Sequence, residues 1–186
     1  MFEPRDGTKA ELRKRFKALR AECGAEQRLA WSQAVCEHLA AFCLETGIHR
    51  VAAFAPFGTE VDLTFLEFSN PQLTFYFPRV AGVNPPRLVW GPRPLEPGTW
   101  GLQEPACAPN ALPPVQLILV PGLAFAADGQ RLGYGRGFYD SVLAALPEDV
   151  ITLAAGFELQ RCQTLPAGPT DIPVRGLATE AGITWF

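Results

Sequence analysis

The sequence predicts an α/β fold: a single three-layer α/β/α domain with a mainly parallel central sheet. Short apolar runs, such as Leu117–Val120, alternate along the chain with segments whose apolar residues recur at helical spacing. An unbroken apolar run is typical of a strand covered on both faces. The chain has 186 residues, of which 48% are hydrophobic, so it can bury one sizeable core. We therefore predict one domain spanning residues 1–186.

Two helices are predicted at the N-terminal end. Thr8 and Glu11 have the spacing of a capping box, and the apolar residues that follow predict a helix from about Lys9 to Glu22. A second amphipathic segment predicts a helix from about Ala25 to Glu45, which Gly47 ends. The first helix carries a basic stripe that consists of Lys9, Arg13, Lys17 and Arg20. From charge pattern alone, this stripe is interpreted as a solvated face.

Strands and one short helix are predicted for the middle of the chain. Residues 51–57 form an apolar run typical of a buried strand, residues 63–66 a short helix, and residues 73–77 a further strand. Prolines and glycines recur from residue 78 to 114, so short strands and loops are expected there, with Arg87–Trp90 the best strand candidate. Trp100 lies in an apparent loop, where an indole either stacks on a flat heterocycle or caps a core.

The segment from Leu117 to Asp140 has the pattern of an anion site. A buried central strand stops at Pro121, and the loop that follows combines Arg131 and Arg136 with Gly129, Gly133, Gly135 and Gly137 before a helical pattern resumes. Glycines let backbone N–H groups approach a ligand, a helix N-terminus is positive, and arginine offers paired donors to phosphate. The spacing fits neither a Walker A loop nor a dinucleotide fingerprint. A glycine-rich connection with solvated arginines is the equally weighted alternative.

Composition excludes several classes of function. A net charge of −3 and a pI near 5.4 argue against nucleic acid as a partner. The longest apolar stretch is interrupted by Pro121, and the N-terminal residues contain no apolar core of a signal peptide, so we expect a cytoplasmic protein without a membrane span. The five cysteines lack metal-ligand spacing, and Cys36 and Cys43 are expected to be buried on one helix face. Both histidines lie outside every motif, which leaves Ser-His or Cys-His catalysis unsupported.

The run Arg131–Asp140 (RLGYGRGFYD), preceded by Val120–Phe125 (VPGLAF) and Asp128–Gly129, closely resembles the signature of the 5-formyltetrahydrofolate cyclo-ligase family, also called methenyltetrahydrofolate synthetases. The resemblance covers most of the chain. It implies an ATP- and magnesium-dependent conversion of 5-formyltetrahydrofolate to 5,10-methenyltetrahydrofolate, with release of ADP and phosphate. We expect a monomer, although the sequence itself does not determine the oligomeric state. In that chemistry the formyl oxygen attacks the γ-phosphate and the N10 amine then closes the ring, which requires positioning and charge neutralisation rather than a protein nucleophile.

The resemblance also implies a role for individual residues. Arg131 and Arg136 would be catalytic, as stabilisers of the migrating phosphoryl group. The implied nucleotide ligands are Lys9, Arg13, Arg131, Leu132, Gly133, Tyr134, Gly135, Arg136, Gly137 and Tyr139. The implied folate ligands are Ala55, Glu60, Trp100, Tyr134, Phe138 and Tyr139. Asp140 and Asp171 would hold magnesium. Without the resemblance, Glu60 would be assigned as a partner of a helix N-terminus.

The sequence departs from the family pattern at three places. Thr170 replaces the histidine of a His-Asp-x-x-Val segment, Ala126–Ala127 stand where an aspartate usually follows the phenylalanine, and Phe138 replaces a frequent tyrosine. Asp128 is a candidate to replace the missing aspartate. These differences concern metal geometry and substrate contacts more than the reaction. Two alternatives remain: a non-catalytic folate- or nucleotide-binding paralogue, and a structural or interaction protein on the same scaffold.

Overall fold

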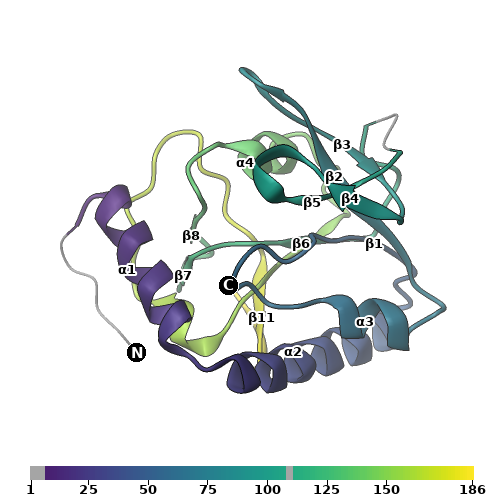
Figure 1. The fold of residues 1–186 in the computed structure, drawn as a ribbon, viewed down its shortest axis with the longest axis horizontal. Coiled ribbons are helices and arrows are strands. Elements are labelled where there is room, and N and C mark those ends of the chain that lie inside the picture. Colours follow the sequence, from purple (N-terminus) through teal and green to yellow (C-terminus); the bar gives the residue numbers. More distant parts are fainter. Residues whose placement is uncertain (1–6, 108–110) are drawn as a thin grey trace.

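The computed structural model describes residues 7–107 and 111–186, and it confirms the predicted α/β class (Figure 1). Its main sheet has seven strands in the order β12-β11-β9-β6-β1-β2-β3. The five inner strands run parallel to one another, whereas β12 and β3 pair antiparallel at the two edges. In chain order the strands are β1 (Arg50–Ala52), β2 (Thr74–Val83), β3 (Pro86–Gly91), β6 (Leu117–Val120), β9 (Ile151–Ala155), β11 (Gly176–Thr179) and β12 (Gly182–Trp185).

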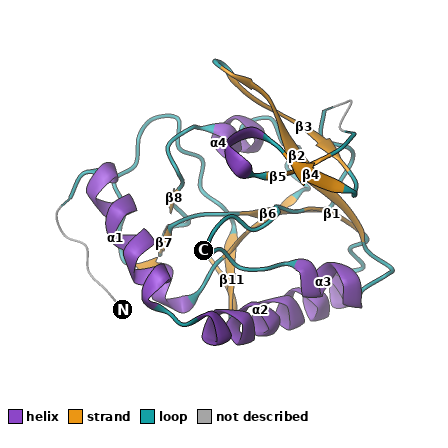
Figure 2. Cartoon of the chain, viewed as in Figure 1, coloured by secondary structure: helices purple, strands orange, loops and turns teal. Residues whose placement is uncertain are grey.

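Helices cover both faces of this sheet, as Figure 2 shows. On one face, α2 (Ala25–Thr46) and α3 (Thr64–Ser69) pack against residues such as Leu119 of β6. On the other face, α4 (Phe138–Leu143) packs against residues such as Ile118. Successive strand residues point to opposite faces, so a continuous apolar run supplies both cores. No helix in the described part of the chain is long and apolar enough to cross a membrane.

The first helix, α1 (Lys9–Glu22), has the predicted bounds and the predicted Thr8–Glu11 capping box. Its buried residues Leu12 and Phe16 pack on a small sheet in the order β10-β7-β8. The strands of that sheet are β7 (Ala124–Ala126), β8 (Arg131–Leu132) and β10 (Arg161–Cys162). Because β8 leads directly into the glycine loop, this packing places α1 beside the loop.

Two strand predictions were wrong at their ends. The strand predicted over residues 51–57 ends at Ala52, and Pro56 in the segment beyond it has no N–H to donate to a ladder. The strand predicted to stop at residue 77 continues as β2 to Val83 and forms a hairpin with β3. Beyond Tyr76, β2 pairs with β3 and no longer with β1, so Pro78 can sit in it with its nitrogen on the unpaired side.

A second hairpin follows within the proline-rich segment. It consists of β4 (Leu95–Pro97), the 3-10 turn η1 (Thr99–Gly101) and β5 (Gln103–Pro105). Short strands and loops were predicted here, and residues 108–110 of this segment lie outside the described residues. The hairpin packs on β2, so η1 carries Trp100 over the same side of the sheet as α4.

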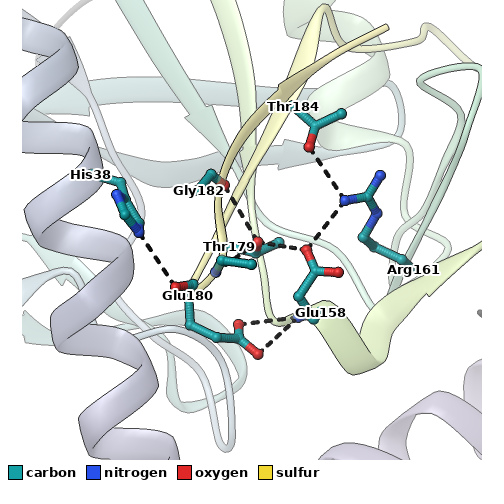
Figure 3. A network of polar contacts seen from close by, with 8 residues as sticks. His38, Glu158, Arg161, Thr179, Glu180, Gly182 and Thr184 are labelled. Carbon is teal, nitrogen blue, oxygen red and sulfur yellow. Dashed lines mark hydrogen bonds and ion pairs between the residues drawn. The ribbon is translucent and has the colours of Figure 1, made fainter.

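A polar network ties the C-terminal hairpin to the rest of the fold (Figure 3). The carboxylate of Glu158, in the 3-10 turn η2 (Glu158–Gln160), accepts hydrogen bonds from Thr179 at 2.6 Å and Arg161 at 3.2 Å. The backbone N–H of Glu158 donates to the Glu180 carboxylate at 3.1 Å, and His38 of α2 lies 3.3 Å from the Glu180 carbonyl oxygen. This network anchors β11 and β12 to α2 and η2.

The two cysteines predicted to be buried on α2 are buried. Burial raises the pKa of Cys36 to about 12 and that of Cys43 to about 11. Neither thiol is therefore activated as a nucleophile.

Candidate active site

A cavity of about 600 Å³ opens at the carboxyl ends of β1 and β6. This is the edge where parallel α/β sheets bind ligands. One wall comes from α1, one from the glycine loop with the start of α4, and one from the β4–β5 hairpin with β2. Every residue that the sequence assigned to nucleotide, folate or metal lines this cavity: Lys9, Arg13, Ala55, Glu60, Trp100, residues 131–140 and Asp171. Their binding roles stay predictions.

The glycine loop, residues 133–137, is shaped around Arg13 of α1. Arg13 Nε donates a hydrogen bond to the Gly133 carbonyl at 2.8 Å. Gly135 has a φ of +92°, and a Cβ there would lie 3.0 Å from the Arg13 guanidinium. Glycine is therefore required at Gly135 for two reasons, since a side chain would strain the backbone and displace the arginine. The loop and α1 present Arg13 to the cavity together.

Arg131 joins the glycine loop to α4 and to the segment before β11. Its side chain is only 5% exposed. Nη2 donates to Asp140 Oδ1 at 2.8 Å, and Nη1 donates to the Ile172 carbonyl at 2.7 Å. The Ile172 N–H also donates to Asp140 Oδ1, at 3.2 Å. A guanidinium held by two acceptors has a fixed position, which is what a preorganised stabiliser of charge needs.

Lys9 and Asp171 form an ion pair at the edge of the cavity. The Gly168 N–H donates to the same Asp171 oxygen at 2.6 Å. Burial acts to raise the pKa of Asp171, but the hydrogen bonds from Lys9 and the Gly168 N–H, with the charges of Lys9 and Arg131, outweigh burial and leave that pKa below its ordinary value. Lys9, a predicted nucleotide ligand, and Asp171, a predicted metal ligand, are thus paired with each other.

The two acidic side chains fit a magnesium ion that phosphates help to hold. Asp140 and Asp171 both line the cavity, and each forms an ion pair, Asp140 with Arg131 and Asp171 with Lys9. Among residues 7–107 and 111–186, no group of three or more acidic, histidine or cysteine side chains could hold a metal alone. Phosphate-bound Mg²⁺ generally takes one or two carboxylates, with phosphate oxygens and water as its other ligands. The donor set therefore fits Mg²⁺ only together with a phosphorylated ligand.

Aromatic side chains form the opposite wall. Trp100 has a φ of +56°, a left-handed conformation that is unusual for a tryptophan, and its side chain is 46% exposed. The Arg136 guanidinium lies 4.4 Å from the Trp100 ring centre, and the Phe138 ring lies 6.1 Å away at 52°. This arrangement offers a flat, partly exposed surface next to a cation.

Buried polar groups lie deeper in the cavity. Glu60 is 9% exposed, and its Oε2 accepts a hydrogen bond from the Phe57 N–H at 2.9 Å. Burial raises the pKa of Glu60, and burial also raises the pKa of Tyr134 to about 12. The Tyr139 hydroxyl is buried and has no hydrogen-bond partner among the residues that the structure describes. A buried hydroxyl without a partner is costly, so a cavity ligand is the expected acceptor or donor.

Two expectations about this region need correction. Asp128 does not line the cavity and instead accepts a hydrogen bond from the Gln130 N–H at 3.1 Å, in the turn between β7 and β8. It therefore does not replace the missing family aspartate. The helix after the glycine loop, α4, has only six residues, so its dipole adds little and the positive charge comes from the arginines.

Sequence reasoning missed two buried charged residues. Glu104 of β5 lines the cavity and accepts a hydrogen bond from the Val80 N–H at 3.2 Å, and no sequence pattern marked it. Arg20 was interpreted as part of a solvated stripe, but it is 2% exposed. A signal was present for Arg20, because it continues the buried row of Leu12 and Phe16 at four-residue spacing.

The fold and cavity together define an α/β protein with a candidate ligand site at the carboxyl edge of a parallel sheet, and this site is cationic on one side and aromatic on the other. The family model described as the 5-formyltetrahydrofolate cyclo-ligase family matches residues 5–180. The chain belongs to this family, and it is an enzyme of the ligase class.

Individual relatives agree with this assignment. The chain is 28% identical to 5-formyltetrahydrofolate cyclo-ligase of Mus musculus, over 90% of this chain and 89% of the relative. It is 35% identical to the cyclo-ligase of Mycolicibacterium smegmatis, over 69% and 72% of the two chains. Among solved structures, 5,10-methenyltetrahydrofolate synthetase of Aquifex aeolicus has a TM-score of 0.81 at 31% identity and covers 95% of this chain and 92% of its own. The Mycoplasma pneumoniae synthetase, with 21% identity and a TM-score of 0.76 over 94% of this chain and 99% of its own, supports the fold.

Proposed function

We propose that this enzyme converts 5-formyltetrahydrofolate to 5,10-methenyltetrahydrofolate at the expense of ATP, in a magnesium-dependent reaction that releases ADP and phosphate. The observation that carries the proposal is that one cavity joins a cationic, glycine-lined wall to an aromatic wall with buried polar groups. The first wall suits a triphosphate, and the second suits a flat heterocycle that carries N–H groups.

The cationic wall would hold the nucleotide. Arg13 and Arg131 are fixed by hydrogen bonds to the protein, so they offer charge with little reorganisation when the ligand arrives. Lys9 is held near the phosphates by its ion pair with Asp171. Asp140 and Asp171 would hold the magnesium ion, which supplies further neutralisation of phosphate charge. Together these side chains would stabilise the phosphoryl group as it moves.

The aromatic wall would hold the folate. Trp100 and Phe138 offer ring surfaces for stacking, Glu60 offers a carboxylate to the N–H groups of the pterin ring, and the unpaired Tyr139 hydroxyl can serve as donor or acceptor. Arg136 lies on the Trp100 ring, so it stands between the two walls. It is therefore well placed for the phosphoryl group that passes from nucleotide to formyl oxygen.

The protein's part in the reaction would be positioning. Cys36 and Cys43 are buried with raised pKa values, and His38 lies in the C-terminal network rather than in the cavity. Direct attack of the formyl oxygen on the γ-phosphate needs no protein nucleophile, only in-line placement in a site that shields the iminium phosphate from water. The N10 amine of the same substrate then displaces phosphate and closes the ring.

A spectrophotometric assay tests this proposal. Purified protein is mixed with 5-formyltetrahydrofolate, ATP and magnesium, and the near-ultraviolet band of the methenyl product is followed, with controls that lack ATP. We expect ATP-dependent growth of that band, abolished in Arg131→Ala and unchanged in Lys14→Met, whose lysine is exposed on α1 outside the cavity. Ligand binding without product would instead indicate a non-catalytic paralogue, and no binding of either ligand would indicate a structural role. Size-exclusion chromatography tests the predicted monomer.

A further inference from the structure

Glu104 of β5 is a buried carboxylate that the proposed reaction does not use. Its side chain is only 3% exposed, and it lines the same cavity as Trp100. Oε1 of Glu104 accepts a hydrogen bond from the Val80 N–H at 3.2 Å. Beyond Tyr76, β2 pairs with β3 and no longer with β1, so the other edge of β2 has no strand partner there. The Glu104 carboxylate thus takes the place of a strand carbonyl at that edge.

The same carboxylate packs against the backbone of Gly98, where the turn that carries Trp100 begins. A Cβ on Gly98 would lie only 2.3 Å from Glu104 Oε2, so a side chain there would displace the carboxylate. The Gly98 N–H donates to the Leu102 carbonyl at 2.8 Å, and the Gly101 N–H donates to the Gly98 carbonyl at 3.2 Å. These two hydrogen bonds close the turn around η1. Glu104 therefore joins β2 to the base of this turn.

The place of the Trp100 ring depends on the backbone of the turn. Trp100 has a φ of +56° and a side chain that is 46% exposed, so the conformation of the turn sets the direction of the ring. The ring meets Arg136 at 4.4 Å and Phe138 at 6.1 Å, and these residues belong to the glycine loop and α4. A shift of the turn would therefore move the Trp100 ring relative to both.

We propose that Glu104 is a positioning residue for substrate recognition: by tying the turn that begins at Gly98 to β2, it fixes the Trp100 ring where a flat heterocycle stacks. The inference rests on the proposed function, because it takes the folate ring as the group that Trp100 meets. A second contact holds the hairpin on β2, since Arg79 Nη1 donates to the Pro105 carbonyl at 2.9 Å. Loss of the Glu104 contacts should thus move the turn while the hairpin stays in place.

Four substitutions separate the contacts of Glu104 from its charge and from the stability of the hairpin. Glu104→Ala removes both contacts, whereas Glu104→Gln keeps an acceptor oxygen and the volume but removes the charge, which lies 4.0 Å from Arg79 Nε. Gly98→Ala drives a methyl group into the carboxylate, and the φ of −121° at Gly98 imposes no left-handed strain on an alanine. Glu96→Ala is the matched control, because Glu96 is paired with Glu104 across β4 and β5 and contacts Arg79 at 3.2 Å, yet it is half exposed and does not line the cavity.

The position of Trp100 is measured without any ligand. Protein that contains 5-fluorotryptophan gives a fluorine-19 NMR signal for each of its four tryptophans, and Trp100→Phe assigns the signal of Trp100. The affinity and the KM for 5-formyltetrahydrofolate and for ATP are then measured for the same variants. Urea unfolding gives the stability of each variant.

We expect Glu104→Ala to shift the Trp100 signal and to raise the folate KM roughly three- to tenfold, the scale of one aromatic contact, while the KM for ATP changes little. Gly98→Ala should have the same two effects. It should add little in a protein that already carries Glu104→Ala, because the clashing carboxylate is then absent. Glu104→Gln and Glu96→Ala should stay near the unmodified protein in both measurements.

Several results would overturn the proposal. One is an unmoved Trp100 signal in folded Glu104→Ala, and another is full additivity of Gly98→Ala and Glu104→Ala. A folate KM raised as much by Glu104→Gln as by Glu104→Ala would mean that charge matters instead of the contact with the turn. A loss of stability with equal changes in the KM for folate and ATP would indicate a purely structural role. If Glu104→Ala does not fold, Gly98→Ala decides, and the proposal falls if its Trp100 signal or its folate KM is unchanged.

The failure of the proposed function would look different. A protein that binds 5-formyltetrahydrofolate without forming product would refute the cyclo-ligase reaction, while the folate affinity of Glu104→Ala would still support or overturn the role of Glu104. A protein that binds no folate would overturn both the proposed function and the recognition role of Glu104.

Discussion

Replacing Gly135 with alanine should weaken the protein more than the same change at neighbouring glycines. A φ of +92° costs an alanine about 1–3 kcal/mol. The new Cβ would lie 3.0 Å from the Arg13 guanidinium, so the guanidinium must move and its 2.8 Å hydrogen bond to the Gly133 carbonyl is lost, at about 1 kcal/mol. We therefore expect Gly135→Ala to lower the free energy of unfolding by about 2–4 kcal/mol and to raise the KM for ATP.

The glycine loop supplies its own controls for this prediction. Gly137 has a φ of +73°, but its nearest neighbour would lie 3.8 Å from a Cβ, so Gly137→Ala carries the backbone cost alone. A Cβ on Gly133 would meet nothing within 4 Å at an ordinary φ, so Gly133→Ala should change stability little. Urea unfolding should rank Gly135→Ala as the most destabilised and Gly133→Ala as the least. The reasoning would be refuted if Gly133→Ala and Gly135→Ala lowered the free energy of unfolding equally. It would also be refuted if Gly135→Ala cost as much stability in a protein that already carries Arg13→Ala, because the displaced guanidinium is then absent.

Four further outcomes are expected. Arg131→Ala should lower turnover about 100-fold or more, and it should also weaken stability in urea because a buried ion pair with Asp140 is broken; normal turnover in folded protein would remove the assignment. Asp140→Asn should weaken the magnesium dependence of turnover, and a normal magnesium titration counts against that role. Tyr139→Phe should leave the melting temperature unchanged, because the hydroxyl has no partner, yet raise the folate KM; an unchanged KM would mean that the hydroxyl meets no ligand. Burial, and then the charge of Glu158, raise the pKa of Glu180, so ionisation of Glu180 costs stability as pH rises through that pKa. Glu180→Gln should stabilise the protein at neutral pH by less than about 1 kcal/mol, and urea unfolding in acid should show no such gain.

Helices were predicted more accurately than strands because their ends are set by local chemistry. The Thr8–Glu11 capping box begins α1, and Gly47 in a left-handed conformation ends α2, and both signals can be identified in a few residues. Strand ends depend on partners that are distant in sequence. The strand β1 stops at Ala52 although apolar residues continue, and β2 continues through Pro78 because β3 pairs with it on one side.

The site was predictable where its residues are contiguous. The run from Arg131 to Asp140 forms one wall of the cavity, as its glycine and arginine pattern indicates. Lys9, Trp100 and Asp171 were assigned only through the family resemblance, because no local pattern brings segments so far apart to one cavity. The structure adds their contacts: the ion pair of Lys9 with Asp171, and Arg136 on the ring of Trp100. Periodicity and spacing contain no information on such pairs.

Arg20 shows why a charge pattern alone cannot separate a solvated side chain from a buried one. It belongs both to the basic stripe of α1 and to the buried row of Leu12 and Phe16. Whether a guanidinium in that position can be buried depends on acceptors that the helix does not contain, and here they come from segments 39 to 114 residues away. Burial raises the pKa of Glu60, and the charge of Arg20 opposes that rise without reversing it. The alternative assignment of Glu60 as a helix N-terminal partner fails for the same reason, because its carboxylate accepts from the Phe57 N–H and faces the cavity instead of capping α3. The burial of Arg20 and the place of Glu60 in the cavity wall both depend on contacts between distant segments, which neither residue's own neighbourhood in the sequence reveals.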